Sequence, residues 1–598
     1  MTTVDHADVR ASLQDGTYPR PQLLRESWAD LSGPWTFAFD DEDAGRAAGW
    51  HTSRGFDRTI QVPFPPESAA SGIGDPTPRS VFWYQREVTA DELAAAGHAP
   101  GRRLRLNFGA VDYRCEVWVD GTCVGGHVGG QTPFSFDVTD ALADTATHSV
   151  VVRAYDDPRD AAQPRGKQDW QDEPHAIWYH RTSGIWQPVW LESVPPVAVG
   201  VLHWTVDVPR ASVVARIVLG ERPSGETPVE VELSFDGRRI ARVATQTTEP
   251  ELEVTLQLPD VVNGQGYHAM VWHPDRPRLV DAVVRVGDDV VASYLGLRTA
   301  GVEGGRFALN GEPYYLRSVL SQGYWPDSHL AAPSAEALRR EVELIKELGF
   351  NAARLHQKYE DPRLLFWADR LGLLLWGEAP AALAFGPTAV ERTIAEWLRV
   401  VERDYSHPSI VAWVPLNESW GVQYIRYDHR MVEFARAITA LTRAVDATRP
   451  VVCNDGWEQV DTDVVAIHDY EWDGGVIAER YRDQVAIDHM LDTVGPAGRP
   501  LVLAGDVTGK PVMLTEFGGV SFDTSQRRDA WGYSVATSPE DFATRVGAIL
   551  DGVRASRVLA GYCYTQLTDT LQETNGLLNA DRTPKLPVEQ LRGIITGR

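Results

Sequence analysis

The segment Val411–Gly421 reads VAWVPLNESWG and joins an apolar run directly to Asn417 and Glu418. The apolar part is typical of a fully buried strand. A carboxylate at the end of such a strand loses hydration, which costs free energy unless a function or a partner requires it there. Because functional side chains of a parallel barrel lie where its strands end, the segment predicts a barrel strand that ends in a functional glutamate.

The sequence around this segment has the pattern expected of such a barrel. After about Thr299, short apolar runs alternate with amphipathic helical patterns, the order expected of parallel β/α units. The candidate strands are YYLRSVL near 314, NAARLH near 351, LLLWGE near 373, IVAWVPLN near 410, VVCND near 451, VVAIHD near 464, VMLTE near 512 and GYCYTQL near 561. The clearest helix has Ser334 as its cap, Gly349 as its stop, and an apolar stripe of Leu338, Val342, Ile345 and Leu348. These patterns predict a (β/α)8 TIM barrel over residues 299–598.

The first half of the chain has short runs with a period of two, which are typical of antiparallel strands. Examples before residue 195 are SGPWTFAFDD, RLRLNFGAV, CEVWVDGTCVGG and HSVVVRAYDD, and the Asp120-Gly121 pair is a strong hairpin signal. The pattern returns over residues 196–298 with about seven runs. The sequence therefore predicts two β-sandwiches, over residues 1–195 and 196–298, before the barrel.

Composition excludes several classes of partner. The chain has 598 residues, with 57 Lys and Arg against 83 Asp and Glu, so its formal net charge is −26 and it should repel nucleic acids and anionic membranes. We see neither a signal-like amino terminus nor eighteen consecutive apolar residues, so we expect a soluble, cytoplasmic protein. The four cysteines have no metal-ligand spacing and there is no HExxH pattern, so we expect no metal and no cofactor.

A second glutamate ends another candidate strand in the same way. The seventh strand, PVMLTEFGG, carries Glu516 after its apolar run. Strands four and seven lie across a barrel mouth from each other, so Glu418 and Glu516 should face one cleft. Two carboxyl groups across a cleft suit glycoside hydrolysis: roughly 5 to 5.5 Å between them favours a nucleophile and retention, whereas roughly 6.5 to 9.5 Å leaves room for a water and gives inversion.

The chain resembles glycoside hydrolase family 2, whose members include β-galactosidases, β-glucuronidases and β-mannosidases. The motifs that carry the resemblance are LSGPWTFAFD, VPFPPES, EVWVDG, GGQTPFSFDVT, TSGIWQPVWLE, WHPDRPRL, YLGLR, LNGEPYYLRSV, ARLHQ, HPSIVAWVPLNESWG and MLTEFGG. The resemblance implies a jelly-roll sugar-binding-like sandwich, an immunoglobulin-like sandwich and a catalytic barrel, in that order. It also implies a retaining, exo-acting β-glycosidase that needs no organic cofactor.

The resemblance assigns roles to matching residues. Glu418 matches the family's acid/base, and Glu516 matches its nucleophile. Asn417 should bond the 2-hydroxyl of the sugar, a contact that strengthens in the transition state. The remaining supporting residues are Arg354 and Tyr470, which should donate hydrogen bonds to Glu516, and His356 and His468, which could hold ring hydroxyls.

The chain departs from the familiar family pattern around the sugar. Gln322 and Trp325 stand where an arginine-glycine turn is common after the first barrel strand, and Gln566 stands in the eighth strand where a tryptophan is common. The loop DDPRDAAQPRGKQDWQDEPHAIWYHRTSGIW either is a solvated loop or carries Lys167 to the substrate, where the ammonium would pair with a uronate carboxylate.

These departures leave the substrate open. The asparagine-x-lysine motif of β-glucuronidases is not evident near the eighth strand, so a β-galactoside, as pyranoside or furanoside, is the first expectation. A β-glucuronidase or an α-L-arabinofuranosidase of the same family is the alternative. The alternative from another class is a carbohydrate-binding protein that does not catalyse a reaction. A third alternative is a transglycosylase, which would use the same chemistry but transfer the sugar to an acceptor other than water. The expected partner is a glycoside or oligosaccharide, and a homo-oligomer follows by analogy.

Overall fold

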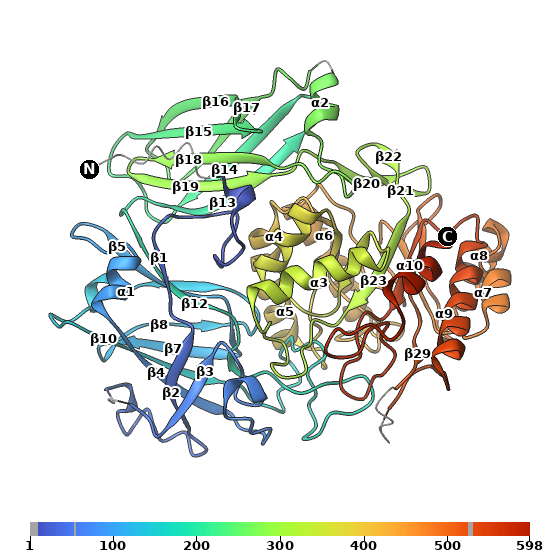
Figure 1. Cartoon of the computed structure of the whole chain (residues 1–598), viewed down its shortest axis with the longest axis horizontal. Helices are drawn as coiled ribbons and strands as arrows, with labels where there is room; N and C mark the ends of the chain where they lie inside the picture. The colour runs from blue at the N-terminus through green and yellow to red at the C-terminus, as the bar shows by residue number, and fades with distance from the viewer. Residues whose placement is uncertain (1–9, 53–54, 263, 524–529) are drawn as a thin grey trace.

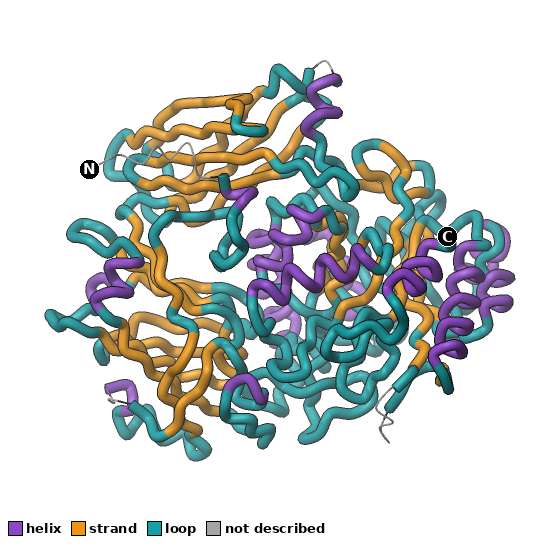
Figure 2. The backbone as a smooth tube through the Cα atoms, in the orientation of Figure 1, coloured by secondary structure: helices purple, strands orange, loops and turns teal. Residues whose placement is uncertain are grey.

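The computed structural model of the chain describes residues 10–52, 55–262, 264–523 and 530–598. The β-rich first half occupies the left and top of the view in Figure 1, and the barrel with its helices occupies the centre and right. Figure 2 shows the same division as a change from strands to mixed strands and helices. The predicted fold class, two sandwiches followed by a barrel, is confirmed.

The first sandwich pairs a four-stranded sheet with a six-stranded one. The first sheet has the order β1 (Trp28–Asp30), β12 (Val189–Val194), β5 (Arg103–Phe108), β9 (Phe134–Asp137). The second has the order β3 (Arg58–Val62), β2 (Gly33–Phe39), β4 (Val81–Val88), β10 (His148–Tyr155), β7 (Arg114–Val119), β8 (Thr122–Val128). Short elements β6 (Val111–Asp112), β11 (Gly184–Ile185) and α1 (Ala90–Ala95) complete it. Asp120 and Gly121 join β7 to β8 with positive φ angles of 49° and 79°, as a tight hairpin requires.

The second sandwich has a three-stranded sheet facing a four-stranded sheet. Its strands are β13 (Val199–Asp207), β14 (Ser212–Leu219) and β17 (Glu251–Gln257) in one sheet, and β16 (Arg238–Thr247), β15 (Thr227–Phe235), β18 (Val280–Val286) and β19 (Asp289–Leu295) in the other. Helix α2 (Gln265–Met270) follows β17. Alternating side chains such as Val213, Ala215 and Ile217 of β14 are buried between the sheets, which is the period-two pattern of the sequence.

The barrel strands run parallel in the order β26 (Ile410–Val414), β25 (Leu374–Glu378), β24 (Ala352–Leu355), β23 (Leu316–Ser321), β31 (Gly561–Thr565), β28 (Val512–Gly518), β27 (Val465–Asp469). A small antiparallel sheet precedes them: β20 (Ala300–Glu303), β21 (Arg306–Leu309) and β22 (Glu312–Pro313). The helices are α3 (Ala335–Glu347), α4 (Pro362–Leu371), α5 (Pro387–Asp404), α6 (His429–Val445), α7 (Gly474–Arg480), α8 (Gln484–Asp492), α9 (Pro539–Arg554) and α10 (Val588–Thr596). Two short strands, β29 (Val520–Ser521) and β30 (Ser534–Val535), pair after β28.

Helix α3 has the predicted cap and the predicted buried face. The hydroxyl of Ser334 accepts a hydrogen bond from the backbone N–H of Ala337, and Gly349 adopts a φ of +97° just after the helix. The predicted apolar stripe is buried, so the amphipathic pattern identified this helix correctly.

The fifth predicted strand, VVCND near 451, differs from the expectation. This segment makes only two isolated parallel bridges to the β26 side, at Val451 and at Asp455. Toward β27, the side-chain amide of Gln459 takes the place of backbone pairing: it donates to the carbonyl of Ala466 at 2.8 Å and accepts from its N–H at 3.1 Å. A polar side chain therefore closes the barrel where a regular strand was expected.

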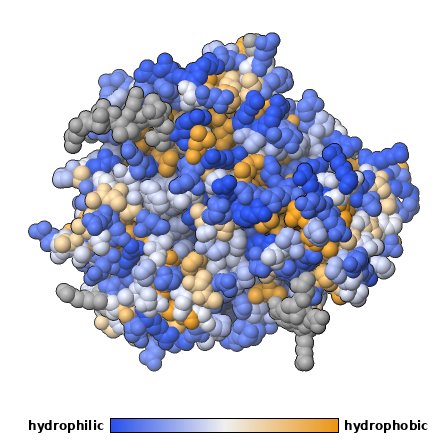
Figure 3. Space-filling view, in the orientation of Figure 1, coloured by the Kyte–Doolittle hydropathy of each residue, from blue (hydrophilic) through white to orange (hydrophobic). Residues whose placement is uncertain are grey.

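The face shown in Figure 3 is largely hydrophilic, with smaller hydrophobic patches between the polar residues. Within the described ranges, every helix is too short or too polar to cross a membrane.

Candidate active site

Both predicted catalytic glutamates lie at the carboxyl ends of barrel strands. Glu516 belongs to β28, and Glu418 follows the end of β26. The backbone at Glu418 has a φ of +50°, and its N–H donates to the carbonyl of Asp455 at 2.9 Å. The N–H of Ser419 donates to the side chain of Asn454 at 2.9 Å. These bonds hold the sharp turn that redirects the chain after the strand, and so they fix where the Glu418 carboxylate points.

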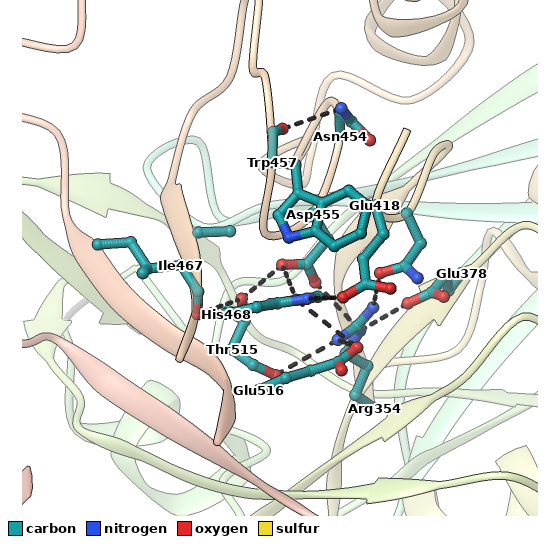
Figure 4. Close-up of polar contacts among 12 residues, drawn as sticks. Arg354, Glu378, Glu418, Asn454, Asp455, Trp457, Ile467, His468, Thr515 and Glu516 are labelled. Carbon is teal, nitrogen blue, oxygen red and sulfur yellow. Dashed lines mark hydrogen bonds and ion pairs between the residues drawn. The ribbon is translucent and has the colours of Figure 1, made fainter. Parts of the chain in front are cut away.

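His468, from β27, lies between the two glutamates (Figure 4). Its Nδ1 is 2.8 Å from Oε1 of Glu418, and its Nε2 is 3.6 Å from Oε1 of Glu516 and 3.3 Å from Oδ1 of Asp455. One ligand atom from each of Glu418, His468 and Glu516 lies within 4.8 Å of the other two. The two glutamates therefore lie close together at one site.

Arg354, from β24, is fully buried and connects most of the remaining polar groups. Its Nη1 donates to Oε1 of Glu516 at 2.7 Å, and its Nε donates to Oε2 of Glu378 at 2.6 Å. Its Nη2 donates to Oδ1 of Asn417 at 2.5 Å, and Asp455 is 3.0 Å from its Nε. One guanidinium thus fixes the positions of both Glu516 and Asn417.

The surrounding charges set the protonation state of Glu516. Burial alone would raise the pKa of Glu516, but the positive charges of His468 and Arg354 lower it to about 2. Burial alone would lower the pKa of His468, but the negative charge of Glu516 and the hydrogen bonds to Asp455 and Glu418 raise it to about 10. Near neutral pH the site therefore contains an ionised Glu516 beside an imidazolium.

Tyr470 also supports Glu516. Its hydroxyl donates a short hydrogen bond to Oε2 of Glu516, and its ring stacks on Tyr533 with 3.5 Å between the ring centroids. The stacking fixes the ring, so the hydroxyl is held in place for the carboxylate.

Of the remaining predicted substrate contacts, His356 lies near the two glutamates and Trp325 lies in a separate hollow. His356 is buried with its Nδ1 3.0 Å from Glu378 and 4.0 Å from Glu516, and burial and the charge of Arg354 lower its pKa well below the usual value. The amide of Gln322 donates to Gln566 at 2.8 Å. Trp325 lines a different hollow, together with Tyr324 and His329, and Arg582 covers its ring at 3.5 Å from the centroid.

The long loop of the first sandwich is fixed to the barrel. The N–H of Gly166 donates to the carbonyl of Ala381 at 3.1 Å, and Asp160 forms an ion pair of 2.6 Å with Arg392 of α5. Gly166 has a φ of +60°, and a Cβ atom there would lie 2.2 Å from the carbonyl oxygen of Gln357. Only glycine permits this close approach.

The fixed loop buries Lys167 near the catalytic carboxylates. Its side chain is 7% exposed, and its ammonium lies 4.8 Å from the ring centroid of Trp178. Burial lowers the pKa of Lys167, whereas the charges of Glu573, Glu418 and Glu516 act in the opposite direction. Among the described residues, nothing accepts a hydrogen bond from this ammonium, and no carboxylate forms an ion pair with it.

The sequence analysis did not single out two further carboxyl groups of the site. Glu378 ends β25, and burial raises its pKa to about 7 despite the charge of Arg354. Asp455 ends the VVCND segment; burial would raise its pKa, but Arg354 and His468 lower it to about 2. Both follow an apolar run, as Glu418 and Glu516 do, so the same pattern could have identified them.

Three side chains that can carry or exchange a proton meet at the centre of the site. Glu418, His468 and Glu516 form the one cluster in the described ranges with enough metal-ligating side chains close together for an ion. Two carboxyl groups on either side of an imidazole, at 2.8 Å and 3.6 Å from its nitrogen atoms, also suit acid–base and nucleophilic chemistry.

Comparisons with known proteins agree with this architecture. Residues 28–195 match the sugar binding domain of glycosyl hydrolases family 2, and residues 300–520 match the TIM barrel domain of the same family. A β-glucuronidase from Paenibacillus borealis is 27% identical over 84% of each chain. A β-galactosidase from Thermoanaerobacter pseudethanolicus is 27% identical over 62% of this chain, which spans about half of that relative, 48% of its length.

Solved structures share the whole fold. The β-glucuronidase of Bifidobacterium dentium superposes with a TM-score of 0.75 at 19% identity, covering 96% of this chain and 98% of that one. A β-galacturonidase from Eisenbergiella tayi superposes with a TM-score of 0.72 at 20% identity, covering 96% and 98%. The two family matches, the complete fold and the paired glutamates at the strand ends lead to one conclusion: the chain belongs to glycoside hydrolase family 2.

Proposed function

We propose that the protein is an exo-acting β-glycosidase that retains the anomeric configuration. The observation that carries this proposal is the short separation of Glu418 and Glu516, whose oxygen atoms approach within 4.8 Å. A direct displacement requires carboxyl groups roughly 5 to 5.5 Å apart, whereas an intervening water requires roughly 6.5 Å or more.

In the proposed reaction, Glu516 attacks the anomeric carbon while Glu418 protonates the departing oxygen. Glu418 then takes a proton from the water that releases the sugar. The low pKa of Glu516, about 2, supports its role as the nucleophile, because the carboxylate is ionised before the substrate arrives.

Asn417 would hold the sugar at its 2-hydroxyl. Its Oδ1 accepts a hydrogen bond from Arg354, which leaves the amide N–H groups to donate to the substrate. Such a contact strengthens as positive charge develops on the sugar ring.

We further propose that the sugar is a uronate, with β-glucuronide as the first choice. The relatives and the similar structures are mostly β-glucuronidases, so they support this alternative better than the galactoside expected from the sequence. Lys167 supplies an independent argument. No acceptor in the described part of the chain takes a hydrogen bond from this buried ammonium, and a substrate carboxylate would offset the resulting desolvation cost with charge-assisted hydrogen bonds.

The alternative to a uronate is a neutral sugar whose hydroxyl groups contact Lys167. The carboxylate of Glu573 favours a neutral sugar, because among the charged neighbours of Lys167 it has the largest electrostatic effect on the ammonium. However, the hydroxyl of Tyr179 already donates to Glu573, and within the described ranges no ion pair joins Glu573 to Lys167. The ammonium therefore remains available for an anionic group.

The test is a panel of 4-nitrophenyl β-glycosides: glucuronide, galacturonide, glucoside, galactoside and galactofuranoside. We expect the glucuronide or galacturonide to have the highest kcat/KM. A 2-deoxy-2-fluoro uronosyl fluoride should trap the intermediate, and peptide mass spectrometry should locate the label on Glu516. A label on another residue would overturn the proposed mechanism, and a preference for a neutral sugar would overturn only the substrate assignment.

A further inference from the structure

The turn that carries Glu418 has an unusual backbone conformation. Glu418 and Ser419 follow each other with positive φ angles of 50° and 57°. Residues other than glycine disfavour this conformation, so it persists only where surrounding bonds hold it. Part of that support comes from the end of the VVCND run and the residues after it. The N–H of Ser419 donates to the side chain of Asn454 at 2.9 Å, and its hydroxyl donates to Glu458 at 2.6 Å.

Asp455 belongs to the same segment and contacts the turn through its backbone. Its N–H donates to the carbonyl of Leu416 at 2.9 Å, and its carbonyl accepts from the N–H of Glu418 at 2.9 Å. A parallel bridge also joins Asp455 to Asn417. These bonds flank the acid/base on both sides, so the position of Glu418 depends on the position of the Asp455 backbone.

The carboxylate of Asp455 contacts the groups around the nucleophile (Figure 4). Its Oδ2 lies 3.0 Å from Nε of Arg354, whose Nη1 binds Glu516. Its Oδ1 accepts a hydrogen bond from the hydroxyl of Thr515 and lies 3.3 Å from Nε2 of His468. Thr515 directly precedes Glu516 in β28. The side chain of Asp455 thus fixes the surroundings of Glu516, as its backbone fixes Glu418.

We propose that Asp455 is a positioning residue that sets the separation between Glu418 and Glu516. The inference rests on the proposed function, because a direct displacement requires the two carboxyl groups at a short, fixed distance. A shift of either glutamate relative to the other would break bonds of Asp455. The proposal also gives a function to the irregular fifth strand, whose last residues bind the turn of the acid/base.

A simpler interpretation is that Asp455 only balances the charge of Arg354. Two other carboxylates already pair with that guanidinium, Glu378 at 2.6 Å and Glu516 at 2.7 Å. A third buried carboxylate adds a further desolvation cost. Moreover, the bond from Thr515 and the backbone bonds to the turn do not involve Arg354. Charge balance alone therefore does not account for the contacts of Asp455.

The kinetic test replaces the carboxylate by an amide of the same shape. With the best 4-nitrophenyl glycoside of the panel, Asp455→Asn should lower kcat about 100-fold, the cost of misplacing reacting groups by about 1 Å, and leave KM within about threefold. Thr515→Val removes one bond to the carboxylate and no charge, so it should lower kcat by a smaller factor. It tests the same point if Asp455→Asn does not fold.

The matched control is Asp369→Asn in α4. Asp369 is also a fully buried carboxylate, and it accepts from the hydroxyl of Tyr294 at 2.8 Å and from the N–H of Ser409 at 2.9 Å. This substitution should lower Tm and leave kcat and KM unchanged. If Asp455→Asn likewise lowers only Tm, or changes KM alone, Asp455 has a merely structural role and the proposal is wrong.

A structural measurement separates this proposal from the proposed reaction. Crystal structures of the full chain as wild type, Asp455→Asn, Thr515→Val and Asp369→Asn give the distance between the carboxyl groups of Glu418 and Glu516. We expect this distance to change by about 1 Å in Asp455→Asn and to stay constant in Asp369→Asn. Displaced glutamates in a protein that hydrolyses no glycoside would support the positioning role and count only against the proposed reaction. Glutamates that stay in place would overturn the proposal whatever the activity.

Discussion

Nδ1 of His468 lies 2.8 Å from Oε1 of Glu418. The contact orients the proposed acid/base and brings a positive charge within hydrogen-bond distance of it. The same ring lies 3.6 Å from Glu516, so one imidazolium acts on both carboxyl groups. This arrangement has a direct consequence for the pH dependence of the reaction.

His468→Asn should move the acidic limb of the pH profile to higher pH. Glu516 must be ionised to attack, and its pKa of about 2 depends on the charges of His468 and Arg354. Removal of one positive charge raises that pKa, so the nucleophile becomes protonated at a higher pH. The measurement is kcat/KM against pH, with the exposed His429→Asn as the control. An acidic limb that stays in place would contradict the electrostatic role of His468.

Glu418→Ala should separate substrates by their leaving groups. A 4-nitrophenolate departs without protonation, whereas an alkoxide requires a proton from the acid. We expect a loss of about 10²- to 10⁴-fold in kcat/KM for alkyl glycosides and a much smaller loss for 4-nitrophenyl glycosides. Equal losses on both classes would argue against Glu418 as the acid.

Lys167→Met should reverse the preference between charged and neutral sugars. The substitution keeps the length of the side chain and removes the charge. A hydrogen bond to a charged group contributes about 1.5–3 kcal/mol, so kcat/KM for the β-glucuronide should fall about 10- to 150-fold. The β-glucoside is the internal control, since it has no carboxylate. If both substrates lose activity equally, Lys167 does not select a uronate.

Gly166→Ala should displace the loop that carries Lys167. A methyl group there would lie 2.2 Å from the carbonyl oxygen of Gln357, in a backbone conformation that disfavours alanine. We expect a lower Tm, a loss of about 1–3 kcal/mol in stability, and a raised KM for the uronide. Gly225→Ala is the matched control, because no atom lies within 4 Å of the added Cβ. An unchanged KM would indicate that the loop can move without affecting the substrate.

The sequence predicted the architecture because each type of element has its own periodicity. Strand and helix patterns identified both sandwiches, and the Ser334 cap and Gly349 stop delimited α3. The fifth barrel strand was not predictable in this way. Its apolar composition resembles a strand, but Gln459, which lies later in the chain, supplies the contacts on one side.

The sequence predicted the positions of the two glutamates at strand ends, and the structure places them there. Glu418 and Glu516 end apolar runs, and local pattern is enough to find them. The position of Trp325 depends on Arg582, which is 257 residues later and covers its ring. A contact between residues so far apart in the chain cannot be predicted from a local sequence pattern. Whether Lys167 faced solvent or the barrel likewise depended on bonds such as that between Gly166 and Ala381.

The anchored loop has a consequence for how this enzyme can be divided or recombined. Both glutamates come from the barrel, whereas the ammonium that faces them comes from the first sandwich. A chimera that joins this barrel to the sandwich of another family member would contain the proposed catalytic residues Glu418 and Glu516. It would lack Lys167, which is proposed to bind the carboxylate of the sugar. In this proposal, substrate choice depends on one domain and the chemistry on another, and the two come together only when the chain folds.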